Sequence, residues 1–207
     1  KTVFTMNGGE LSDNVGGSVA GVINVMGSHP VEVNLLGGAV VNNSMSTTGA
    51  NIACISATND GSTVVLGAVK FAGNTNKNGE TINALTLSTH NVTLIPTEDT
   101  DFQDPIYINN AYGSSKDVAI RVPEGLTKLK GKLPILLAKE FVGAATISGG
   151  TGEGAYALQP SDMEKVHVVN GIDGAYYLEV NENNTAVFAE VKTNDIVVYL
   201  SGNGNDT

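Results

Sequence analysis

VFTMNGGELSDN, at residues 3–14, is the first of three related stretches that predict the fold of this chain. The second is VNLLGGAVVNN at residues 33–43, and the third is VVLGAVKFAGN at residues 64–74, in which Val69 replaces the second glycine. When the stretches are aligned on their closing asparagines, these recur 29 and then 31 residues apart, at Asn14, Asn43 and Asn74. A repeat of this length is typical of solenoids, in which each coil of chain buries its apolar face on the next.

Each period also contains a second short apolar segment after a glycine-bearing turn, at residues 22–25, 52–55 and 85–87. Short, evenly spaced strands fit either a sandwich of antiparallel hairpins or a parallel β-helix. In a β-helix, equivalent residues of successive coils stack about 4.8 Å apart, so a repeated asparagine forms a ladder. A sandwich gives no reason for the same residue every 30 or so positions. We therefore predict an all-β parallel β-helix with a structural ladder of the three asparagines.

The second half of the chain has a different pattern, and we expect it to close the solenoid. We assign residues 1–125 to the β-helix coils and residues 126–207 to closing coils and a small C-terminal β cap. Four segments of the cap resemble antiparallel strands, at residues 156–158, 166–169, 176–180 and 186–188. Residues 181–184, NENN, are a natural hairpin turn between the last two. An open solenoid end exposes unpaired strand groups, which is why a cap is expected.

Charge and composition exclude several classes of function. The formal net charge is −10 with Arg121 as the single arginine, which disfavours binding to nucleic acid or to an anionic membrane surface. No segment is long and apolar enough to span a bilayer, so we predict no membrane insertion. The chain starts at Lys1 without a methionine or a signal peptide, so we expect Lys1 to lie inside a longer or processed protein. The single cysteine, Cys54, lies in an apolar run and is interpreted as a buried, inert thiol.

The densest acidic run is EDTDFQD at residues 98–104, and its carboxylates are a candidate Ca²⁺ site: Glu98, Asp99, Asp101 and Asp104. Ca²⁺ prefers several oxygen ligands, but the EF-hand spacing is absent, so the alternative is a solvated loop. The same carboxylates would serve a polysaccharide lyase or glycoside hydrolase, which needs paired acids or an added basic group. Arg121 near Asp117 is the one such group, and no convergent set is visible. We predict no catalytic residues and no cofactor other than this candidate calcium.

Tyrosines are concentrated in the second half of the chain, and four are candidate ligand contacts: Tyr107, Tyr112, Tyr176 and Tyr177. Exposed tyrosines beside Asn and Asp side chains would stack on sugar faces and bind carbohydrate. The alternative is that they only pack within the strands. The sequence GTGEGA at residues 150–155 matches a loose dinucleotide fingerprint, but Pro160 falls in the expected helix, so we interpret it as a turn.

The FTMNGGELSDN stretch at residues 4–14 resembles a coil of right-handed parallel β-helix adhesin-like surface proteins of gut bacteria and methanogens, distant relatives of polymorphic and autotransporter-type passengers. Residues 69–74, 83–87 and 177–187 resemble the last coil and the closing hairpin of that family. The resemblance implies a right-handed helix and a secreted or cell-surface protein. It also implies a non-enzymatic role in display, in binding of a glycan or protein of a host or microbial surface, or in self-association. The rival hypothesis is the β-helix polysaccharide enzyme.

Overall fold

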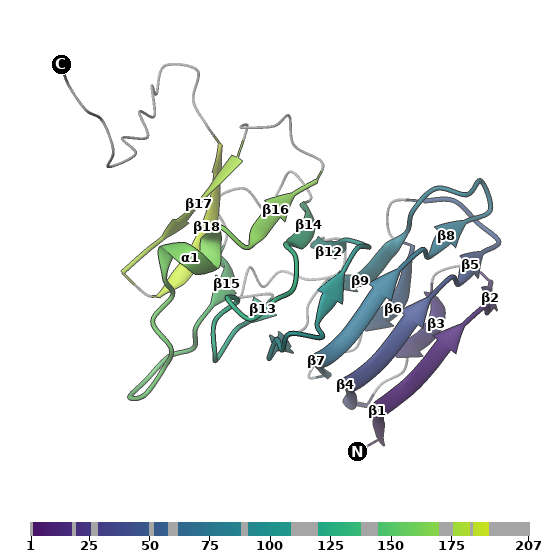
Figure 1. The fold of residues 1–207 in the computed structure, drawn as a ribbon, viewed down its shortest axis with the longest axis horizontal. Helices are drawn as coiled ribbons and strands as arrows, with labels where there is room; N and C mark the ends of the chain where they lie inside the picture. The colour runs from purple at the N-terminus through teal and green to yellow at the C-terminus, as the bar shows by residue number, and fades with distance from the viewer. Residues whose placement is uncertain are drawn as a thin grey trace.

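Each of the three repeats forms one long strand that is bent near its glycines: β1 (Thr2–Ser12), β4 (Val31–Val41) and β7 (Thr63–Ala72). The computed structural model describes residues 2–17, 20–25, 29–49, 52–57, 62–87, 91–108, 120–137, 145–169, 176–182 and 184–190. In it these strands pair in parallel, β1 with β4 and β4 with β7, so successive repeats are stacked coils (Figure 1). The parallel β-helix architecture is therefore confirmed, and the antiparallel sandwich is excluded.

Three sheets make up the walls of the solenoid. The long sheet continues from β1, β4 and β7 through β10 (Asn91–Leu94), β13 (Ile120–Arg121) and β15 (Ala145–Ser148) to β18 (Thr185–Glu190) and β17 (Tyr176–Val180), and β11 (Asp101–Phe102) also pairs with β7. The second sheet has the order β16 (Val166–Val168), β14 (Leu133–Leu137), β12 (Ile106–Ile108), β9 (Asn83–Leu87), β6 (Ala53–Ala57) and β3 (Ala20–Val25). The third contains β2 (Val15–Gly16), β5 (Ser44–Met45) and β8 (Thr75–Asn76). About four coils, β1–β3, β4–β6, β7–β9 and β10–β12, form the regular solenoid.

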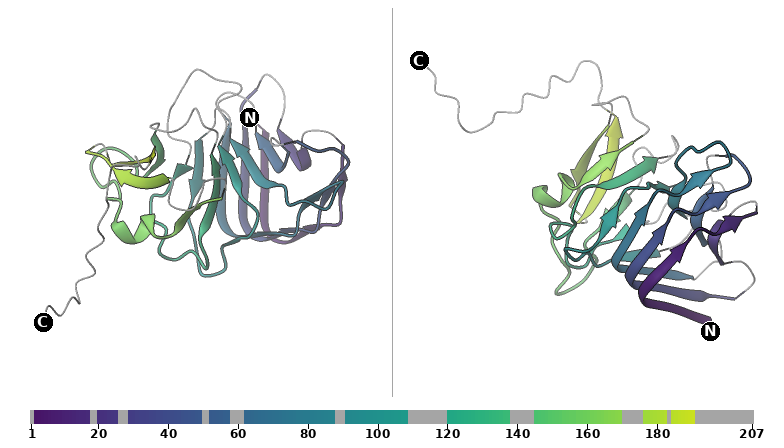
Figure 2. Two further views of the ribbon diagram at one scale, coloured as in Figure 1. Left: turned by 90° about the horizontal axis from the view of Figure 1, so that it is seen from above. Right: turned by 45° about the vertical axis from the view of Figure 1, so that its right-hand side comes forward.

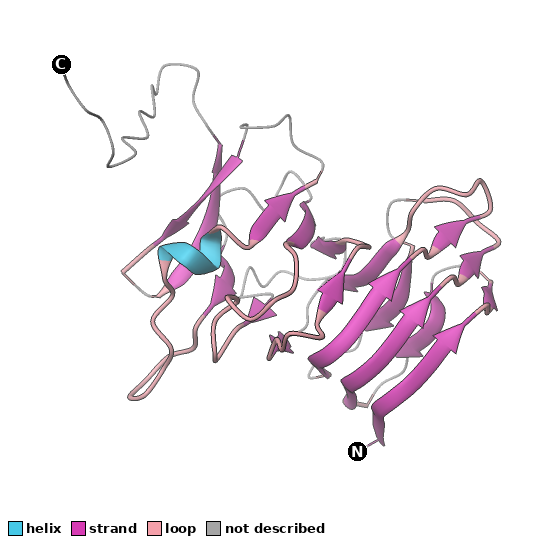
Figure 3. Cartoon of the chain, viewed as in Figure 1, coloured by secondary structure: helices cyan, strands magenta, loops and turns pink. Residues whose placement is uncertain are grey.

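The colour order in Figure 2 follows the stack from the N-terminal coil to the C-terminal strands. Figure 3 shows that nearly all of the regular structure is strand, with the single turn of α1 (Pro160–Met163) as the helix among the described residues. The lysine-bearing segment after residue 126 forms turns and then β14, which pairs in parallel with β12 and β16.

The core consists of apolar residues stacked in register through the coils. One row of the long sheet runs Phe4, Val33, Val64, Val92, Ile120 and Ile147. From Val33 onward every member of this row is at most 1% exposed. A second row ends in Phe71 and Phe102, whose rings stack with centroids 5.3 Å apart and an interplanar angle of 16°. Each coil therefore covers the apolar face of its neighbour, which is where the hydrophobic stabilisation of a solenoid arises.

The long strand of each of the first three coils is followed by a residue with left-handed backbone, directly before the ladder asparagine. These residues are Asp13 with φ 56°, Asn42 with φ 56° and Gly73 with φ 68°. Glycine enters this region freely, and Asp and Asn are the side chains that tolerate it best. The sequence pairs Asp-Asn, Asn-Asn and Gly-Asn thus encode one corner, in which the chain turns and the following asparagine joins the hydrogen-bonded stack.

A glycine pair lets the first two coils approach closely in the middle of their long strands. Gly9 and Gly38 have φ values of 85° and 96°, and the pairing of β1 with β4 shifts register between Asn7 and Glu10. A Cβ atom on Gly38 would lie 2.4 Å from the carbonyl oxygen of Gly9. In the third coil Val69 occupies the position of Gly38 and is fully buried. Gly38 is therefore required by the contact of the first two coils, whereas Gly9 is favoured by its positive φ alone.

We expect Gly38→Ala to lower the free energy of unfolding by about 2–4 kcal/mol, because it adds a positive-φ penalty to a clash with backbone. Gly8→Ala is the matched control, since nothing lies within 4 Å of a Cβ at Gly8. Urea unfolding followed by circular dichroism measures both variants. Equal midpoints for the two would show that coil spacing does not depend on Gly38.

The C-terminal strands close the long sheet with reversed direction. β18 pairs antiparallel with β15, and β17 pairs antiparallel with β18. The backbone N–H of Asn184 donates to the carbonyl of Asn181 across the hairpin turn, so the predicted hairpin of the last two strands is confirmed. The other two predicted cap strands differ from the structure. Residues 156–158 form no strand. The predicted strand at residues 166–169 is present as β16, but its expected antiparallel direction was wrong: it pairs in parallel with β14, because it extends the second sheet by one more coil.

Candidate functional site

The three repeated asparagines lie over one another at the corner between the first and third sheets, and their amides are hydrogen-bonded along the stack. Asn14 donates twice to Oδ1 of Asn43, from its backbone N–H at 3.1 Å and from Nδ2 at 2.9 Å. Asn43 donates to Oδ1 of Asn74 in the same way, at 3.0 Å and 2.9 Å. Asn43 and Asn74 are fully buried, so each oxygen has lost its water and accepts two protein donors instead.

The stack ends at a carboxylate in the fourth coil. The backbone N–H and Nδ2 of Asn74 both donate to Oδ2 of Asp104, which lies 30 residues farther along the chain and is 1% exposed. We call Asn14, Asn43, Asn74 and Asp104 the amide ladder. The sequence analysis placed Asp104 in the calcium loop and missed its role in the ladder. Its 30-residue spacing from Asn74 was the signal that could have identified it.

Backbone carbonyls accept the remaining amide hydrogens of the ladder. Nδ2 of Asn43 lies 2.9 Å from the carbonyl oxygen of Leu11 in the preceding coil, and Nδ2 of Asn74 lies 2.9 Å from that of Val40. Each buried amide is thus bonded both to the next ladder residue and to the previous coil. The ladder therefore joins coils to one another. Its buried polar groups form hydrogen bonds within the protein.

We expect Asn43→Ala to reduce the free energy of unfolding by about 3 kcal/mol or more. The substitution removes the acceptor of both donors of Asn14, the donor to the carbonyl of Leu11 and one of the two donors to Oδ1 of Asn74. Asn14→Ala, at the exposed end, should cost only about 1 kcal/mol because the backbone N–H at position 14 still donates to Asn43. Chemical denaturation of both variants tests the difference. A smaller loss for Asn43→Ala than for Asn14→Ala would contradict a structural role of the ladder.

Burial raises the pKa of Asp104 above its ordinary value of 3.8, although hydrogen bonds from Asn74 and Gly73 oppose the shift. The folded protein therefore binds a proton at Asp104 more tightly than the unfolded chain does. Asp104 in its protonated form therefore contributes to the free energy of unfolding. That contribution is fully present below the ordinary pKa and is lost as the pH rises through the raised pKa.

Asp104→Asn should therefore become more stable relative to the native chain as the pH rises, because the amide oxygen still accepts from Asn74 and stays uncharged, whereas the native carboxylate gains a buried charge. The difference in melting temperature between the variant and the native chain should change in this direction as the pH rises from the ordinary pKa of 3.8 through the raised pKa. Asp101→Asn removes a carboxylate from the same segment outside the ladder and is the matched control. A melting-temperature difference at position 104 that does not change with pH would refute this account.

The predicted calcium loop does not bring its four carboxylates together. Asp104 is committed to the ladder, whereas Glu98 and Asp99 are exposed in a turn. That turn is ordered by Thr100, whose hydroxyl donates to the carbonyl of Gly67 at 2.7 Å. Within the described ranges, no three His, Cys, Asp or Glu side chains are grouped so that they could hold a metal ion. The geometry therefore provides no preformed cage of carboxylates here.

The tyrosines proposed as ligand contacts are distributed over different parts of the solenoid. Tyr107, in β12 of the second sheet, is half-buried and in register with Thr86, which is itself buried. Tyr176 and Tyr177 are in β17 of the long sheet. Tyr112 lies outside the described residues. The described tyrosines therefore belong to two different sheets, and their role as ligand contacts stays a prediction.

A second buried carboxylate, that of Asp162, was not identified from the sequence. It accepts hydrogen bonds from several segments that precede β16. Asp162 accepts from the backbone N–H of Leu126 at 2.7 Å, from the hydroxyl of Tyr156 at 2.8 Å and from the backbone N–H of Gln159 at 2.8 Å. It connects α1 with the turn after β13. No repeat marked it in the sequence, because its partners are unique to one place in the fold.

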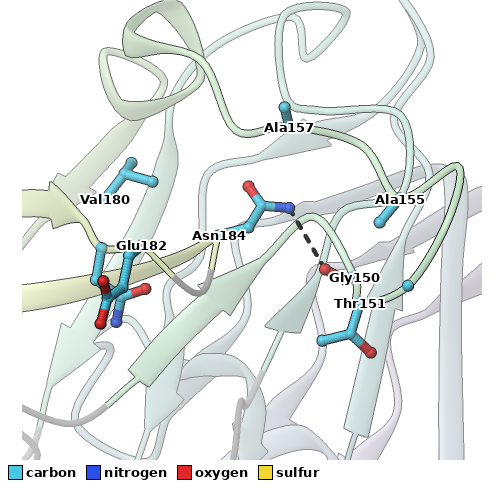
Figure 4. A pocket seen from close by; sticks show the side chains of 9 residues that line it. Gly150, Thr151, Ala155, Ala157, Val180, Glu182 and Asn184 are labelled. Carbon is cyan, nitrogen blue, oxygen red and sulfur yellow. Dashed lines mark hydrogen bonds between the residues drawn. The ribbon is translucent and has the colours of Figure 1, made fainter.

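An open hollow lies between the glycine-rich turn after β15 and the β17–β18 turn (Figure 4). Asn184 lies at its centre: its Nδ2 donates to the carbonyl of Tyr156 at 2.6 Å and its Oδ1 accepts from the backbone N–H of Leu158 at 2.8 Å. Most of the other lining residues are small, and Glu182 is the one charged residue among the described lining residues. Through these hydrogen bonds Asn184 connects the segment after β15 to the β17–β18 hairpin. The GTGEGA sequence lies in a turn, as interpreted from the sequence.

Cys54 is a free cysteine that is fully buried in the core. Burial raises the pKa of its thiol far above the ordinary value, and the nearby charge of Asp104 adds to the shift. The thiol is therefore protonated at neutral pH, as expected for an inert structural cysteine.

No family model, curated protein or solved structure that was compared with this chain matches it. Among the described residues, no helix is long and apolar enough to cross a membrane. The function therefore has to be argued from the geometry of the solenoid itself.

Proposed function

We propose that this chain is a non-enzymatic β-solenoid of an extracellular or cell-surface protein, which serves as a stiff unit for display and binding. The proposal rests mainly on the hydrogen bonds of the buried polar side chains, whose partners are other groups of the same protein. Asn43, Asn74, Asp104 and Asp162 are all bonded to the protein's own framework. A hydrolase or lyase instead requires acids, with or without a basic group, that converge on one open groove.

The surface role is supported by composition and by the resemblance of the repeats. Charged residues make up only 15% of the chain, and Gly, Asn, Ser and Thr take their place. The FTMNGGELSDN stretch resembles the coil of right-handed β-helix adhesin-like proteins. A right-handed winding also agrees with the strong preference of parallel β crossovers for that hand. In such a protein the exposed loops, among them the turn that carries Glu98 and Asp99, bind a glycan or a protein of another surface.

A glycan array, probed with the purified chain with and without calcium, tests this function. We expect binding to at least one class of polysaccharide, and we expect the bound oligosaccharides to be recovered intact. Glu98→Gln combined with Asp99→Asn should remove any calcium dependence, because both side chains are exposed and outside the ladder. Asp104→Asn is the matched control and should leave calcium dependence unchanged.

Two outcomes would contradict the proposal. Shortened or unsaturated oligosaccharides after incubation would show an enzyme of the hydrolase or lyase type. Absence of binding to every glycan, together with absence of binding to surface proteins in the same format, would remove the recognition role.

A further inference from the structure

The open hollow between the glycine-rich turn after β15 and the β17–β18 turn has a volume of about 520 Å³. Sites for small molecules in proteins commonly have volumes of about 300–1,000 Å³. In Figure 4, Thr151 and Ala155 lie on one side of Asn184. Val180 and Glu182 lie on the other side. The hollow therefore has two walls and the size of a ligand site, and none of the amide-ladder residues lines it.

The two walls are held in place by contacts within the protein. Nδ2 of Asn184, on the hairpin, donates to the carbonyl of Tyr156 in the glycine-rich segment at 2.6 Å. At the start of this segment the backbone N–H of Gly150 donates to Oγ of Ser148 at 2.9 Å. Gly149 packs so closely on the carbonyl of Tyr156 that there is no room for a Cβ atom. The hollow is thus formed before a ligand binds, which reduces the entropic cost of binding.

The glycine-rich wall has backbone donors without protein partners. The φ angle is positive at Gly150, Gly152 and Gly154 and negative at the two residues between them. Such an alternation turns consecutive N–H groups toward one side of the chain. The N–H groups of Thr151 and Gly152 have no acceptor in the part of the chain that the structure describes, and both residues line the hollow. These donors are therefore available to an oxygen atom of a ligand.

The opposite wall adds one acceptor, and both walls add apolar surface. The carboxylate of Glu182 is exposed and forms no hydrogen bond or ion pair with the described residues. Val180 on the same wall is 38% exposed, and Ala155 and Ala157 add small apolar side chains to the lining. No lysine or arginine is among the described lining residues. The hollow thus combines neutral donors, one anionic acceptor and small apolar contacts.

We propose that the hollow binds an uncharged sugar residue of a glycan. A sugar hydroxyl can both donate and accept, so one hydroxyl donates to the carboxylate of Glu182 and another accepts from the N–H groups of Thr151 and Gly152. The C–H groups of the sugar ring pack on Val180 and the two alanines. The inference rests on the proposed glycan binding, and it gives that function a place and a class of sugar.

Charged ligands fit the hollow less well. A uronate or a sulfated sugar would bring its charge close to Glu182, in a chain whose formal net charge is −10. A calcium ion requires several oxygen ligands, and Glu182 is the one carboxylate among the described lining residues. The single unpaired carboxylate therefore selects a ligand that donates hydrogen bonds without carrying negative charge.

Titration of the purified chain with trisaccharides, followed by amide chemical shifts in nuclear magnetic resonance, tests the site. The neutral probes are the trisaccharides of glucose, galactose, mannose and N-acetylglucosamine, and the acidic probes are those of galacturonate and mannuronate. We expect saturable binding of at least one neutral probe, with shifts at Thr151, Gly152 and Glu182. Each acidic probe should bind about tenfold more weakly or less, because its carboxylate is repelled by that of Glu182.

Glu182→Gln and Glu153→Gln form a matched pair of variants. Both residues are exposed, and only Glu182 lines the hollow, so each variant loses the same charge and should melt like the native chain. Glu182→Gln should weaken binding of the neutral probe about tenfold, because an amide replaces the charged acceptor. It should also reduce the preference for neutral over acidic probes, since the repulsion is removed. Glu153→Gln should leave both affinities unchanged.

Three results would overturn this site: shifts confined to other residues, equal affinity for neutral and acidic probes, or unchanged affinity in Glu182→Gln. Absence of binding to every neutral probe would also overturn it. If a glycan still binds in any of these cases, the proposed function stands and only the site is wrong. Absence of binding to every glycan and surface protein would overturn the site and the proposed function together.

Discussion

A buried asparagine is stable only when both its oxygen and its amide hydrogens have partners, and this requirement fixes the register of the solenoid. Asn43 meets it only if Asn14 lies directly above and Asn74 directly below. The apolar rows are less demanding, because a core of Val, Leu and Ile accepts a displaced neighbour at modest cost. A slip of one coil by one residue would leave several buried amide groups unpaired, each costing about 1–3 kcal/mol. The ladder therefore selects one stacking among many that hydrophobic burial alone would allow.

The corner geometry and the ladder depend on each other. The left-handed residue before each asparagine, Asp13, Asn42 or Gly73, turns the chain at the corner where the following side chain joins the stack. The turn costs backbone strain unless the residue is Gly, Asn or Asp. The hydrogen bonds made by the asparagine stabilise the turned conformation. This mutual dependence explains why two short polar residues recur together at the end of an apolar strand.

The repeat made the fold predictable, because identical corner chemistry must occur once in every coil. Asp104 was not recognised because the last ladder residue needs only to accept, so its identity changes where the pattern stops. The direction of β16 was wrong because the composition of a strand indicates its conformation but not its partner. Asp162 and Asn184 were missed for another reason: each has a partner in a loop 36 or 26 residues away, and these separations belong to no repeat. The sequence pattern thus predicts the contacts that recur in every coil. Contacts that occur once in the fold are seen only in the three-dimensional structure.

The two ends of a directional ladder cannot be equivalent, and the fold treats them differently. At the C-terminal end, Asp104 stops the donor chain first, and the reversal of β18 then removes the parallel template that a further coil would need. Two independent features therefore end the pattern on that side. At the N-terminal end neither feature is present among the described residues: Asn14 keeps the amide form, and β1 keeps the parallel direction with an apolar face at Phe4. The same interaction that fixes the register inside the solenoid thus also gives it a direction, because the asparagine of the earlier coil donates and that of the later coil accepts.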